Sequence, residues 1–359
     1  MRFGIFDHLD DNGVPMGQLF EERLKLIEAY DRAGFYGYHL AEHHNTPLGY
    51  APSPSVFLSA VAQRTRQLRF GPMVYLLPLY HPLRLIDEIC MLDQMSGGRF
   101  LFGVGRGVSP VEVGFFGVDF ARGMQQFTEA LEVVRRGLTH DVLTYDGEFY
   151  KFDSVPMALK PVQRPYPPLW YGISRQETVS WAVVNDVNVV TFLRETRPLT
   201  DAYRAEWNKL GKGGTELPLL GLTRHIVVAD TDAEARRIAQ RAYRPWRRHM
   251  ELLWEQKGVP FPLQGVLPDE FDPLQRSGHG FAGTPAGARG YIAEQAEEGG
   301  VTYVVCDLAF DDITFDEAIR SVELFAKEVM PEFKERHPRH QQWREQQLDG
   351  VKFPIHSSI

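Results

Sequence analysis

The sequence predicts a single α/β domain folded as a (β/α)8 TIM barrel, and three observations lead to that prediction. Short apolar segments alternate with segments of helical periodicity from the first residues onward, as parallel strands joined by helical crossovers require. Eight strand segments are present, the number that closes a TIM barrel. The length of 359 residues exceeds that of a usual single-core domain, and an α/β barrel with insertions is the main exception.

Four strand–helix units make up the first half of the chain. The segment 16–35 repeats apolar residues at helical spacing and ends at Gly34, where a helix commonly has a C-terminal glycine. The paired glycines Gly97 and Gly98 end a later helix in the same way. The expected strands are 2–9, 36–44, 68–79 and 99–107, and the expected helices are 16–35, 52–65, 81–98 and about 121–139.

The second half continues the alternation with two interruptions. An Asp-Gly pair between β-prone residues predicts a small hairpin over 145–152. After the seventh strand, the stretch 243–285 is too long for one βα unit and is rich in Trp, Pro, Arg and Gly. We expect an insertion on the catalytic face, either a lid or a purely structural excursion. The remaining expected elements are strands at 168–174, 189–193, 222–229 and 303–310 and a closing helix at 315–333.

We expect one domain over residues 1–337, followed by a polar C-terminal tail over 338–359 that packs on a partner subunit or is mobile. The net charge of −8 argues against a nucleic-acid partner, which needs a basic face. The two cysteines, Cys90 and Cys306, lie inside apolar runs and indicate neither a disulfide framework nor a zinc knuckle. There is no signal-peptide pattern and no apolar run of membrane-spanning length, so we expect a cytoplasmic protein with no membrane partner.

In a TIM barrel the carboxyl ends of the strands carry the active site. Those positions hold cations, small residues and imidazoles but few carboxylates, which is unlike a two-carboxylate hydrolase and closer to a site for an anionic cofactor. Gly105 would let the backbone approach a flat ligand, and Arg106 could fork onto a phosphate. Ser174, Arg175 and Thr178 begin a helix after the fifth strand, where backbone amides favour an anion; ordinary turn chemistry is the alternative for each stretch.

Glu42, His43 and His44 end the second strand, and three interpretations of the histidines are open. They could bind a metal, but adjacent residues of a strand point to opposite faces and cannot easily share one ion. One imidazole could act in catalysis, since its pKa suits proton transfer near neutral pH. A packed structural histidine is the third reading. We expect only one of the two to face the barrel mouth, and we expect no metal.

Several motifs resemble the bacterial luciferase-like, flavin-dependent monooxygenases. The resemblance is carried by "AEHH" (41–44), "LLPLYHPLRLIDEICMLDQMSGGRFLFGVGRG" (76–107), "FFGVD" (115–119), "PPLWYGISRQETVSWA" (167–182) and "GTP" (283–285). It covers most of the chain and is strongest up to about residue 125. The series of HP, LDQMSGGRF and FGVGRG is its most specific part.

The resemblance implies a TIM barrel that uses reduced FMN (FMNH2) from a separate NAD(P)H:flavin reductase. It implies that O2, as co-substrate, forms a C4a-peroxyflavin that oxygenates a small organic substrate. Aromatic residues near the expected mouth, such as Phe6, Tyr75 and Trp246, suggest that this substrate is apolar or aromatic; plain packing is the alternative for these residues. It also implies a homodimer, formed through helices that here contain 56–63 and 85–92. An F420-dependent hydride transferase on the same barrel, a non-catalytic flavin-binding protein and a metal-dependent hydrolase are the alternatives.

The resemblance also assigns residues. It implies that His43 lies at the reactive edge of the flavin as the catalytic residue and that Glu42 lies beside the isoalloxazine ring. Gly105 would lie next to the flavin edge. Arg106 would hold the phosphate, with Ser174, Arg175 and Thr178 in a second phosphate segment. Met73 and Val74 match a position where the family has a non-prolyl cis peptide behind the flavin.

Overall fold

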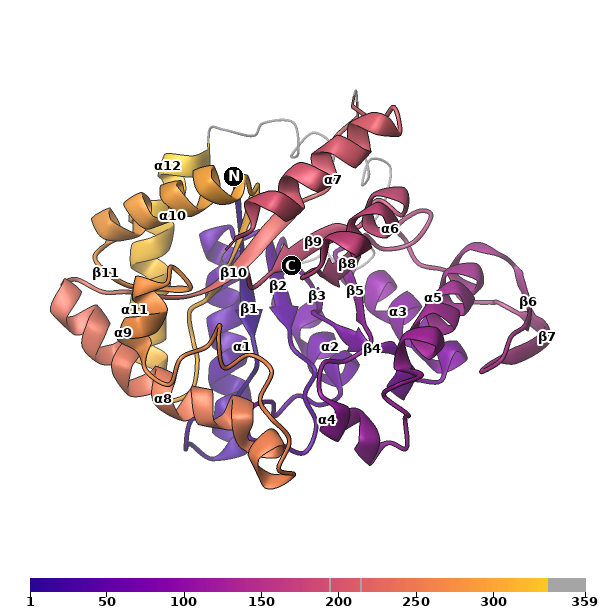
Figure 1. Ribbon diagram of the computed structural model, residues 1–359, viewed down its shortest axis with the longest axis horizontal. Coiled ribbons are helices and arrows are strands. Elements are labelled where there is room, and N and C mark those ends of the chain that lie inside the picture. Colours follow the sequence, from indigo (N-terminus) through magenta and orange to yellow (C-terminus); the bar gives the residue numbers. More distant parts are fainter. Residues whose placement is uncertain (194, 214, 335–359) are drawn as a thin grey trace, which may run out of the picture.

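Eight parallel strands form the barrel wall, as the sequence predicts (Figure 1). The computed structural model describes residues 1–334 of the chain except residues 194 and 214. Each strand pairs with its neighbours in chain order, and Ile5 of the first strand lies opposite Tyr38 of the second and Cys306 of the last. The wall strands are β1 (Arg2–Asp7), β2 (Gly37–Leu40), β3 (Arg69–Pro72), β5 (Phe102–Gly105), β8 (Leu169–Gly172), β9 (Asn188–Thr191), β10 (Leu220–Val228) and β12 (Tyr303–Asp307).

The barrel closes where β3 meets β5. Phe70 receives a backbone hydrogen bond from Leu101 at 2.8 Å and donates one to the carbonyl of Arg99 at 3.1 Å. A two-residue strand, β4 (Tyr75–Leu76), then continues the pairing with β5. The two backbones approach so closely that a Cβ on Gly103 would lie 1.9 Å from the carbonyl oxygen of Pro72. Glycine is therefore required at this seam.

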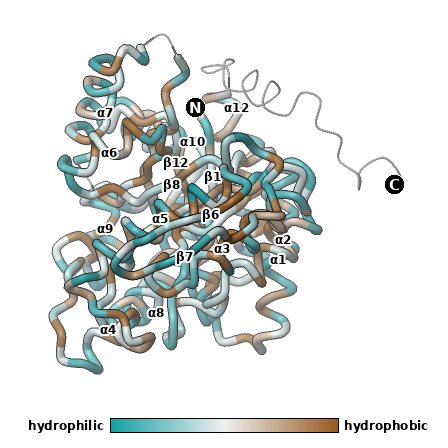
Figure 2. The backbone as a smooth tube through the Cα atoms, turned by 90° about the vertical axis from the view of Figure 1, so that its right-hand side faces the viewer, coloured by the Kyte–Doolittle hydropathy of each residue, from teal (hydrophilic) through white to brown (hydrophobic). Residues whose placement is uncertain are grey.

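The helices cover the outside of the wall, and their sequences are amphipathic. Stretches of hydrophilic and hydrophobic residues alternate along helices such as α7 (Figure 2). Among the described residues, no helix has both the length and the apolar character that crossing a membrane would need. The α-helices are α1 (Met16–Ala33), α2 (Pro54–Arg64), α3 (Pro82–Ser96), α4 (Pro110–Phe115), α5 (Gly123–Thr139), α6 (Val179–Val184), α7 (Arg197–Lys209), α8 (Asp232–Gln256), α9 (Phe271–Arg276), α10 (Pro285–Gly299), α11 (Phe315–Leu324) and α12 (Met330–Lys334).

The inside of the barrel is filled by side chains. Aromatic rings from three strands, Phe6, Trp170 and Tyr303, form part of a buried cluster there. The same space holds His39, which is fully buried and whose Nε2 lies 2.8 Å from the hydroxyl of Tyr303. Burial lowers the pKa of His39 to about 3, so this imidazole is neutral. Because the interior is packed, ligands must bind at an end of the barrel rather than inside it.

The stretch 243–285, expected as an insertion, is largely regular. It contains the second half of α8, the short helix α9 and the strand β11 (Gly280–Gly283). This strand pairs with the carboxyl-terminal end of β10. Both tryptophans of this stretch, Trp246 and Trp254, are buried. The segment 257–270 joins α8 to α9 without regular structure apart from turns. The tail expected over 338–359 lies outside the described residues.

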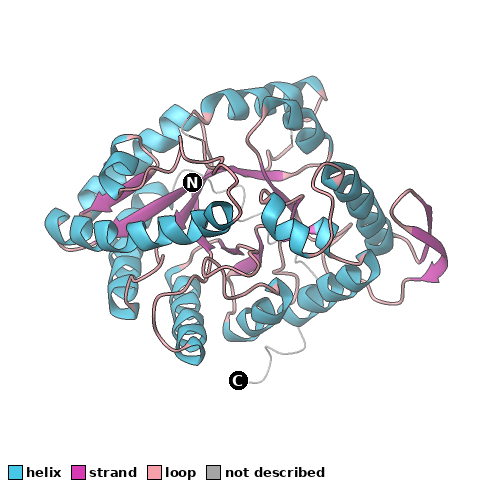
Figure 3. Ribbon diagram, turned by 60° about the horizontal axis from the view of Figure 1, so that its bottom comes forward, coloured by secondary structure: helices cyan, strands magenta, loops and turns pink. Residues whose placement is uncertain are grey.

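The predicted hairpin is present but longer than 145–152. Its strands are β6 (Val142–Asp146) and β7 (Lys151–Pro156), which pair antiparallel. It projects from the ring of helices around the barrel (Figure 3). The predicted range is too short at both ends. The first residues of β6 and the last residues of β7 are mostly exposed, so no apolar alternation marks them as strand.

Candidate active site

The carboxyl ends of the wall strands bring together residues that are far apart in the sequence. His8 follows β1, His43 and His44 follow β2, and Arg106 follows β5. The short helix α4 lies beside the loop after β2 and supplies Glu112. Among the described residues there is no group of three or more His, Cys, Asp or Glu side chains placed to hold a metal ion.

His43 is paired with Glu112. Its Nδ1 lies 3.2 Å from one carboxylate oxygen of Glu112 and 3.3 Å from the other. Burial opposes the charged imidazole, but the charge of Glu112 and the hydrogen bond to it outweigh burial and raise the pKa of His43. Burial likewise opposes the charged carboxylate, yet His43 and the backbone N–H of His44 hold the pKa of Glu112 below its ordinary value. Because Nδ1 faces Glu112, Nε2 of His43 is the ring nitrogen left for a ligand.

His44 is paired with Glu42 instead. Its Nε2 lies 2.9 Å from Oε1 of Glu42. The other oxygen of Glu42 accepts hydrogen bonds from the backbone N–H of Leu76 at 3.1 Å and from the hydroxyl of Tyr80 at 2.9 Å. Burial raises the pKa of Glu42, and the three partners offset this only in part. Glu42 therefore ties the loop after β2 to the loop that follows β3.

The reasoning used to separate the two histidines was wrong. It placed both on a strand over 36–44, whose side chains would alternate, but β2 ends at Leu40. Residues 41–44 lie outside any strand, so strand alternation does not apply to them. The two imidazoles are distinguished by their carboxylate partners, Glu112 for His43 and Glu42 for His44.

The peptide bond between Met73 and Val74 is cis, as the resemblance implies. It follows β3 and lies against β5. A Cβ on Gly105 would lie 2.4 Å from Cγ2 of Val74, so a larger residue at position 105 would require the Val74 side chain to move. Val74 thus lies against Gly105 at the carboxyl end of the barrel, and Met73 precedes it across the cis peptide.

Arg106 and Arg175 lie near one side chain, Tyr171 of β8. Burial raises the pKa of Tyr171, and the charges of Arg106 and Arg175 both act to lower it. The guanidinium of Arg106 lies 4.1 Å from the ring centroid of Phe120, and its Nε donates to the carbonyl of Gly107. In the described part of the chain neither arginine has a carboxylate partner. The two cations remain available for an anionic ligand.

The other two residues of the expected second phosphate segment lie next to Arg175. Ser174 is exposed, and Thr178 is half-buried. The hydroxyl of Thr178 donates to the carbonyl of Arg175 at 2.7 Å, within the turn that leads into α6. This contact stabilises the turn and leaves the hydroxyl oxygen free to accept one further hydrogen bond.

Sequence reasoning missed Glu112, although a signal was present. The sequence Ser109-Pro110-Val111-Glu112 has the spacing of a helix start, and Ser109 caps α4 by accepting from the N–H of Glu112 at 3.2 Å. His8 and His225 also lie at strand ends, but the sequence assigns them no role. Trp246 is expected only as an aromatic residue near the mouth, and Asp307 is not expected at the site; both contact His8 and His225.

Residues 1–304 match the family described as luciferase-like monooxygenase. The chain belongs to the luciferase-like monooxygenase family. Among the curated relatives of this luciferase-like monooxygenase, an uncharacterized protein, y4wF, from Sinorhizobium fredii is 42% identical over 332 residues, covering 92% of this chain and 96% of the relative. The oxygenase component of the flavin-dependent trigonelline monooxygenase from Acinetobacter baylyi is 27% identical, covering 93% of this chain and 96% of the relative.

Solved structures agree with the fold of this luciferase-like monooxygenase. The monooxygenase RslO1 from Streptomyces bottropensis is similar with a TM-score of 0.82 at 26% identity, covering 93% of this chain and all of that one. The oxygenating constituent of 3,6-diketocamphane monooxygenase from Pseudomonas putida, solved in complex with FMN, has a TM-score of 0.71 at 20% identity. It covers 92% of this chain and 98% of that one.

Proposed function

We propose that this chain is the oxygenase component of a two-component system that binds FMNH2, supplied by a separate flavin reductase, and uses O2 to oxygenate a small organic molecule. The observation that carries the proposal is the His43–Glu112 pair at the carboxyl end of a luciferase-like barrel. A buried imidazole whose pKa is raised by a carboxylate can hold or release a proton near neutral pH. Simple cofactor binding would not need such a group.

The residues present fit FMN. Gly105 and the cis peptide Met73–Val74 offer a surface with no projecting side chain at residue 105, which suits a flat ring. Arg106 and Arg175 lack carboxylate partners among the described residues and act on the same tyrosine, which suits a phosphate. The related oxygenase that was solved with FMN has the same fold. When bound and reduced, FMN would supply the electrons that activate O2.

The protein side chains would then handle protons and exclude water. Nδ1 of His43 keeps its hydrogen toward Glu112, so Nε2 is placed to donate or accept a proton at the ligand. Glu42 would not be free to do this chemistry, because all its hydrogen-bonding partners belong to the protein. Its role would be to fix the loop on which His43 lies beside the bound ring.

We also propose a homodimer. Two large apolar side chains on neighbouring helices are exposed, Val56 of α2 at 71% and Met91 of α3 at 53%. They lie in the two segments that the resemblance assigns to the dimer interface. Sedimentation at micromolar concentration should show a species of twice the chain mass, and a clean monomer would refute this assembly.

The experiment that tests the function measures oxygen uptake with FMNH2 supplied by a flavin reductase, against a library of uncharged and charged organic compounds. The proposal predicts that some compounds raise oxygen consumption and appear as oxygenated products, with less hydrogen peroxide released. If reduced F420 supports substrate turnover and FMNH2 does not, the chain is a hydride transferase on the same barrel.

A further inference from the structure

His8 is a second imidazole beside His43, and the cofactor does not account for it. It follows β1 and is 5% exposed. Its ring lies nearly parallel to that of His43, with 5.5 Å between the ring centroids. The ring of Phe6 packs edge-to-face with it, with 4.8 Å between the ring centroids. A buried imidazole at this position must either hydrogen-bond to protein groups or contact a ligand.

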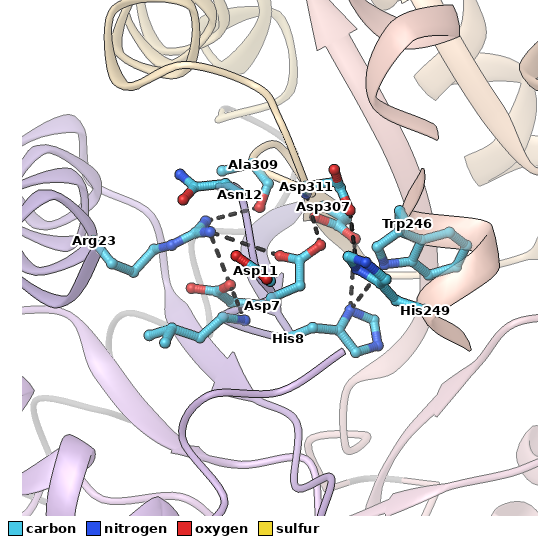
Figure 4. Close-up of polar contacts among 12 residues, drawn as sticks. Asp7, His8, Asp11, Asn12, Arg23, Trp246, His249, Asp307, Ala309 and Asp311 are labelled. Atoms are coloured by element: carbon cyan, nitrogen blue, oxygen red, sulfur yellow. Dashed lines mark hydrogen bonds and ion pairs between the residues drawn. The ribbon is translucent and has the colours of Figure 1, made fainter. Parts of the chain in front are cut away.

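The neighbours of His8 determine which of its nitrogens carries hydrogen (Figure 4). Indole Nε1 of Trp246 lies 3.5 Å from Nδ1 of His8, and an indole nitrogen can only donate. Nδ1 must therefore accept, so the hydrogen of the neutral ring lies on Nε2. Oδ2 of Asp307 lies 4.0 Å from the same Nδ1. Burial raises the pKa of Asp307 well above its ordinary value, which favours the uncharged form of this carboxyl.

The imidazole of His8 is neutral. Burial, together with the nearby His43, His225 and Arg23, lowers its pKa well below the ordinary value. Nδ1 is occupied, and in the described part of the chain Nε2 has no hydrogen-bond partner. His8 thus offers one uncharged N–H donor next to His43.

The backbone around His8 is held by a buried network. The carboxylate of Asp7 accepts from the backbone N–H of Leu9 at 2.7 Å and from the hydroxyl of Tyr38 at 2.6 Å. Arg23 pairs with the same carboxylate and donates to the carbonyl of Ala309 at 2.7 Å. Figure 4 shows Asp7, Arg23 and Ala309 of this network beside His8. The donor is therefore fixed in place before any ligand arrives.

The surroundings of His8 favour an uncharged ligand with apolar surface. Phe6 and Trp246 pack edge-to-face with the imidazole, and Phe192 packs in turn against Phe6. An anion buried in these apolar surroundings would lose its hydration and gain one neutral donor from His8 in return. The oxygen of a carbonyl group is satisfied by a single neutral donor and loses less hydration.

Resting on the proposed function, we propose that His8 is a substrate-positioning residue: its Nε2–H donates to the carbonyl oxygen of an uncharged ketone that lies beside His43. Trp246 has the supporting role of fixing the tautomer. The interaction would orient the carbonyl group toward the face of the flavin that His43 adjoins.

The test compares ketones with their methylene isosteres, in which C=CH2 replaces C=O. Cyclohexanone and adamantan-2-one, with methylenecyclohexane and methyleneadamantane, are titrated into the protein loaded with oxidised FMN. Binding is followed by ¹⁵N NMR of labelled histidine. We expect His8 to show the Nε2–H tautomer, the ketones to shift its resonance, and the isosteres to leave it unmoved.

Two variants separate the hydrogen bond from packing. His8→Phe should weaken ketone binding by roughly 3–10-fold, the worth of one neutral hydrogen bond, and leave isostere binding nearly unchanged. Trp246→Phe keeps a ring but removes the N–H, so it should yield a mixture of His8 tautomers and an intermediate loss. His8→Asn, which retains an N–H donor, should restore part of the preference and serves if the Phe variant does not fold.

The proposal is overturned if ketones do not bind, or if ketones and isosteres bind with the same affinity. It is likewise overturned if His8→Phe changes neither the ketone affinity nor the isostere affinity. It is also overturned if His8 shows the Nδ1–H tautomer. The binding experiment needs no turnover, so the two proposals can fail separately. Ketone binding through His8 without any oxygenated product would refute only the proposed function. If His8→Phe turns over substrate with the same KM as the wild type, only the role of His8 is refuted.

Discussion

Nδ1 of His43 lies 3.2 Å from Oε2 of Glu112, and the same oxygen accepts the backbone N–H of His44 at 2.8 Å. One carboxylate therefore fixes both the orientation of the imidazole and the course of the loop that holds it. Ser109 in turn caps the helix on which Glu112 lies. The site depends on α4 as much as on the barrel strands.

Replacing Glu112 by Gln should lower the pKa of His43, because the charge that raises it is removed. In the wild type, the raised pKa of His43 contributes stability that is complete below its ordinary value of 6.5 and is lost as the pH rises through the folded-state value. The lowered pKa of Glu112 contributes stability above its ordinary value of 4.5 and loses it as the pH falls.

The unfolding free energy of the wild type should therefore exceed that of Glu112→Gln by roughly 1–3 kcal/mol. The difference should be largest between the two ordinary pKa values, 4.5 and 6.5, and smaller above neutral pH. NMR titration of His43 and urea unfolding across the pH range measure the two effects. An unchanged His43 titration would show that Glu112 does not control this imidazole.

Replacing His43 by Ala should leave flavin binding intact while oxygenation falls roughly 10²–10⁴-fold and hydrogen peroxide release rises. In the proposed function, Nε2 of His43 is the atom that exchanges a proton with the ligand. His44→Gln is the control, since Gln can still donate to Glu42 and the change leaves the Glu112 pair in place. Equal product yield from wild type and His43→Ala would remove His43 from the mechanism.

Replacing Arg106 by Ala should weaken FMN binding about tenfold or more, the worth of a charged hydrogen bond to phosphate. Riboflavin, which lacks the phosphate, should lose far less. Arg122→Ala is a matched control, because Arg122 also lies over an aromatic ring, Phe149, but is paired with Glu148. If FMN and riboflavin lose affinity equally, Arg106 does not bind the phosphate.

Replacing Gly103 by Ala should prevent the barrel from closing normally, since the new Cβ would lie 1.9 Å from the Pro72 carbonyl oxygen. We expect a loss of at least about 1–3 kcal/mol in unfolding free energy, or failure to fold. The matched change Gly17→Ala in α1 meets no atom within 4 Å and should stabilise by roughly 0.5–1 kcal/mol. Urea unfolding measures the unfolding free energy of both variants. Equal changes in that free energy would contradict the close approach of the backbones at Gly103.

We propose that the segment 257–270 closes over the site. Its first residue, Lys257, lies with Nζ 5.8 Å from the ring centroid of Phe115 on α4, the helix that carries Glu112. Limited digestion with a nonspecific protease, mapped by mass spectrometry, should cut this segment first, and FMN with substrate should slow the cleavage. Cleavage that is equally fast with and without ligands would leave the segment a structural excursion.

The barrel was predictable from the sequence because local patterns encode it. Strand and helix periodicities mark each unit, and glycines such as Gly34 mark helix ends. The same patterns place His43, Arg106 and Gly105 at strand ends. The cis peptide at Met73–Val74 was reached through the resemblance alone, since no local pattern signals it.

The partners of the site residues were not predictable in this way. Glu112 lies 69 positions from His43, and Trp246 lies 238 positions from His8. Such pairs are set by how α4 and α8 pack on the barrel end, which no local periodicity reports. Strand alternation does not separate His43 from His44 for a related reason: β2 stops at Leu40, and a polar loop can follow a strand without any change in composition.

The most direct test of the central claim is the affinity of the protein for FMNH2, measured by anaerobic titration beside reduced F420 and zinc. The proposed function predicts that FMNH2 binds tightly, that Arg106→Ala weakens it, and that F420 and zinc bind far more weakly. Preferential binding of F420 or of zinc, with weak binding of FMNH2, would contradict the assignment of this chain as an FMNH2-dependent oxygenase.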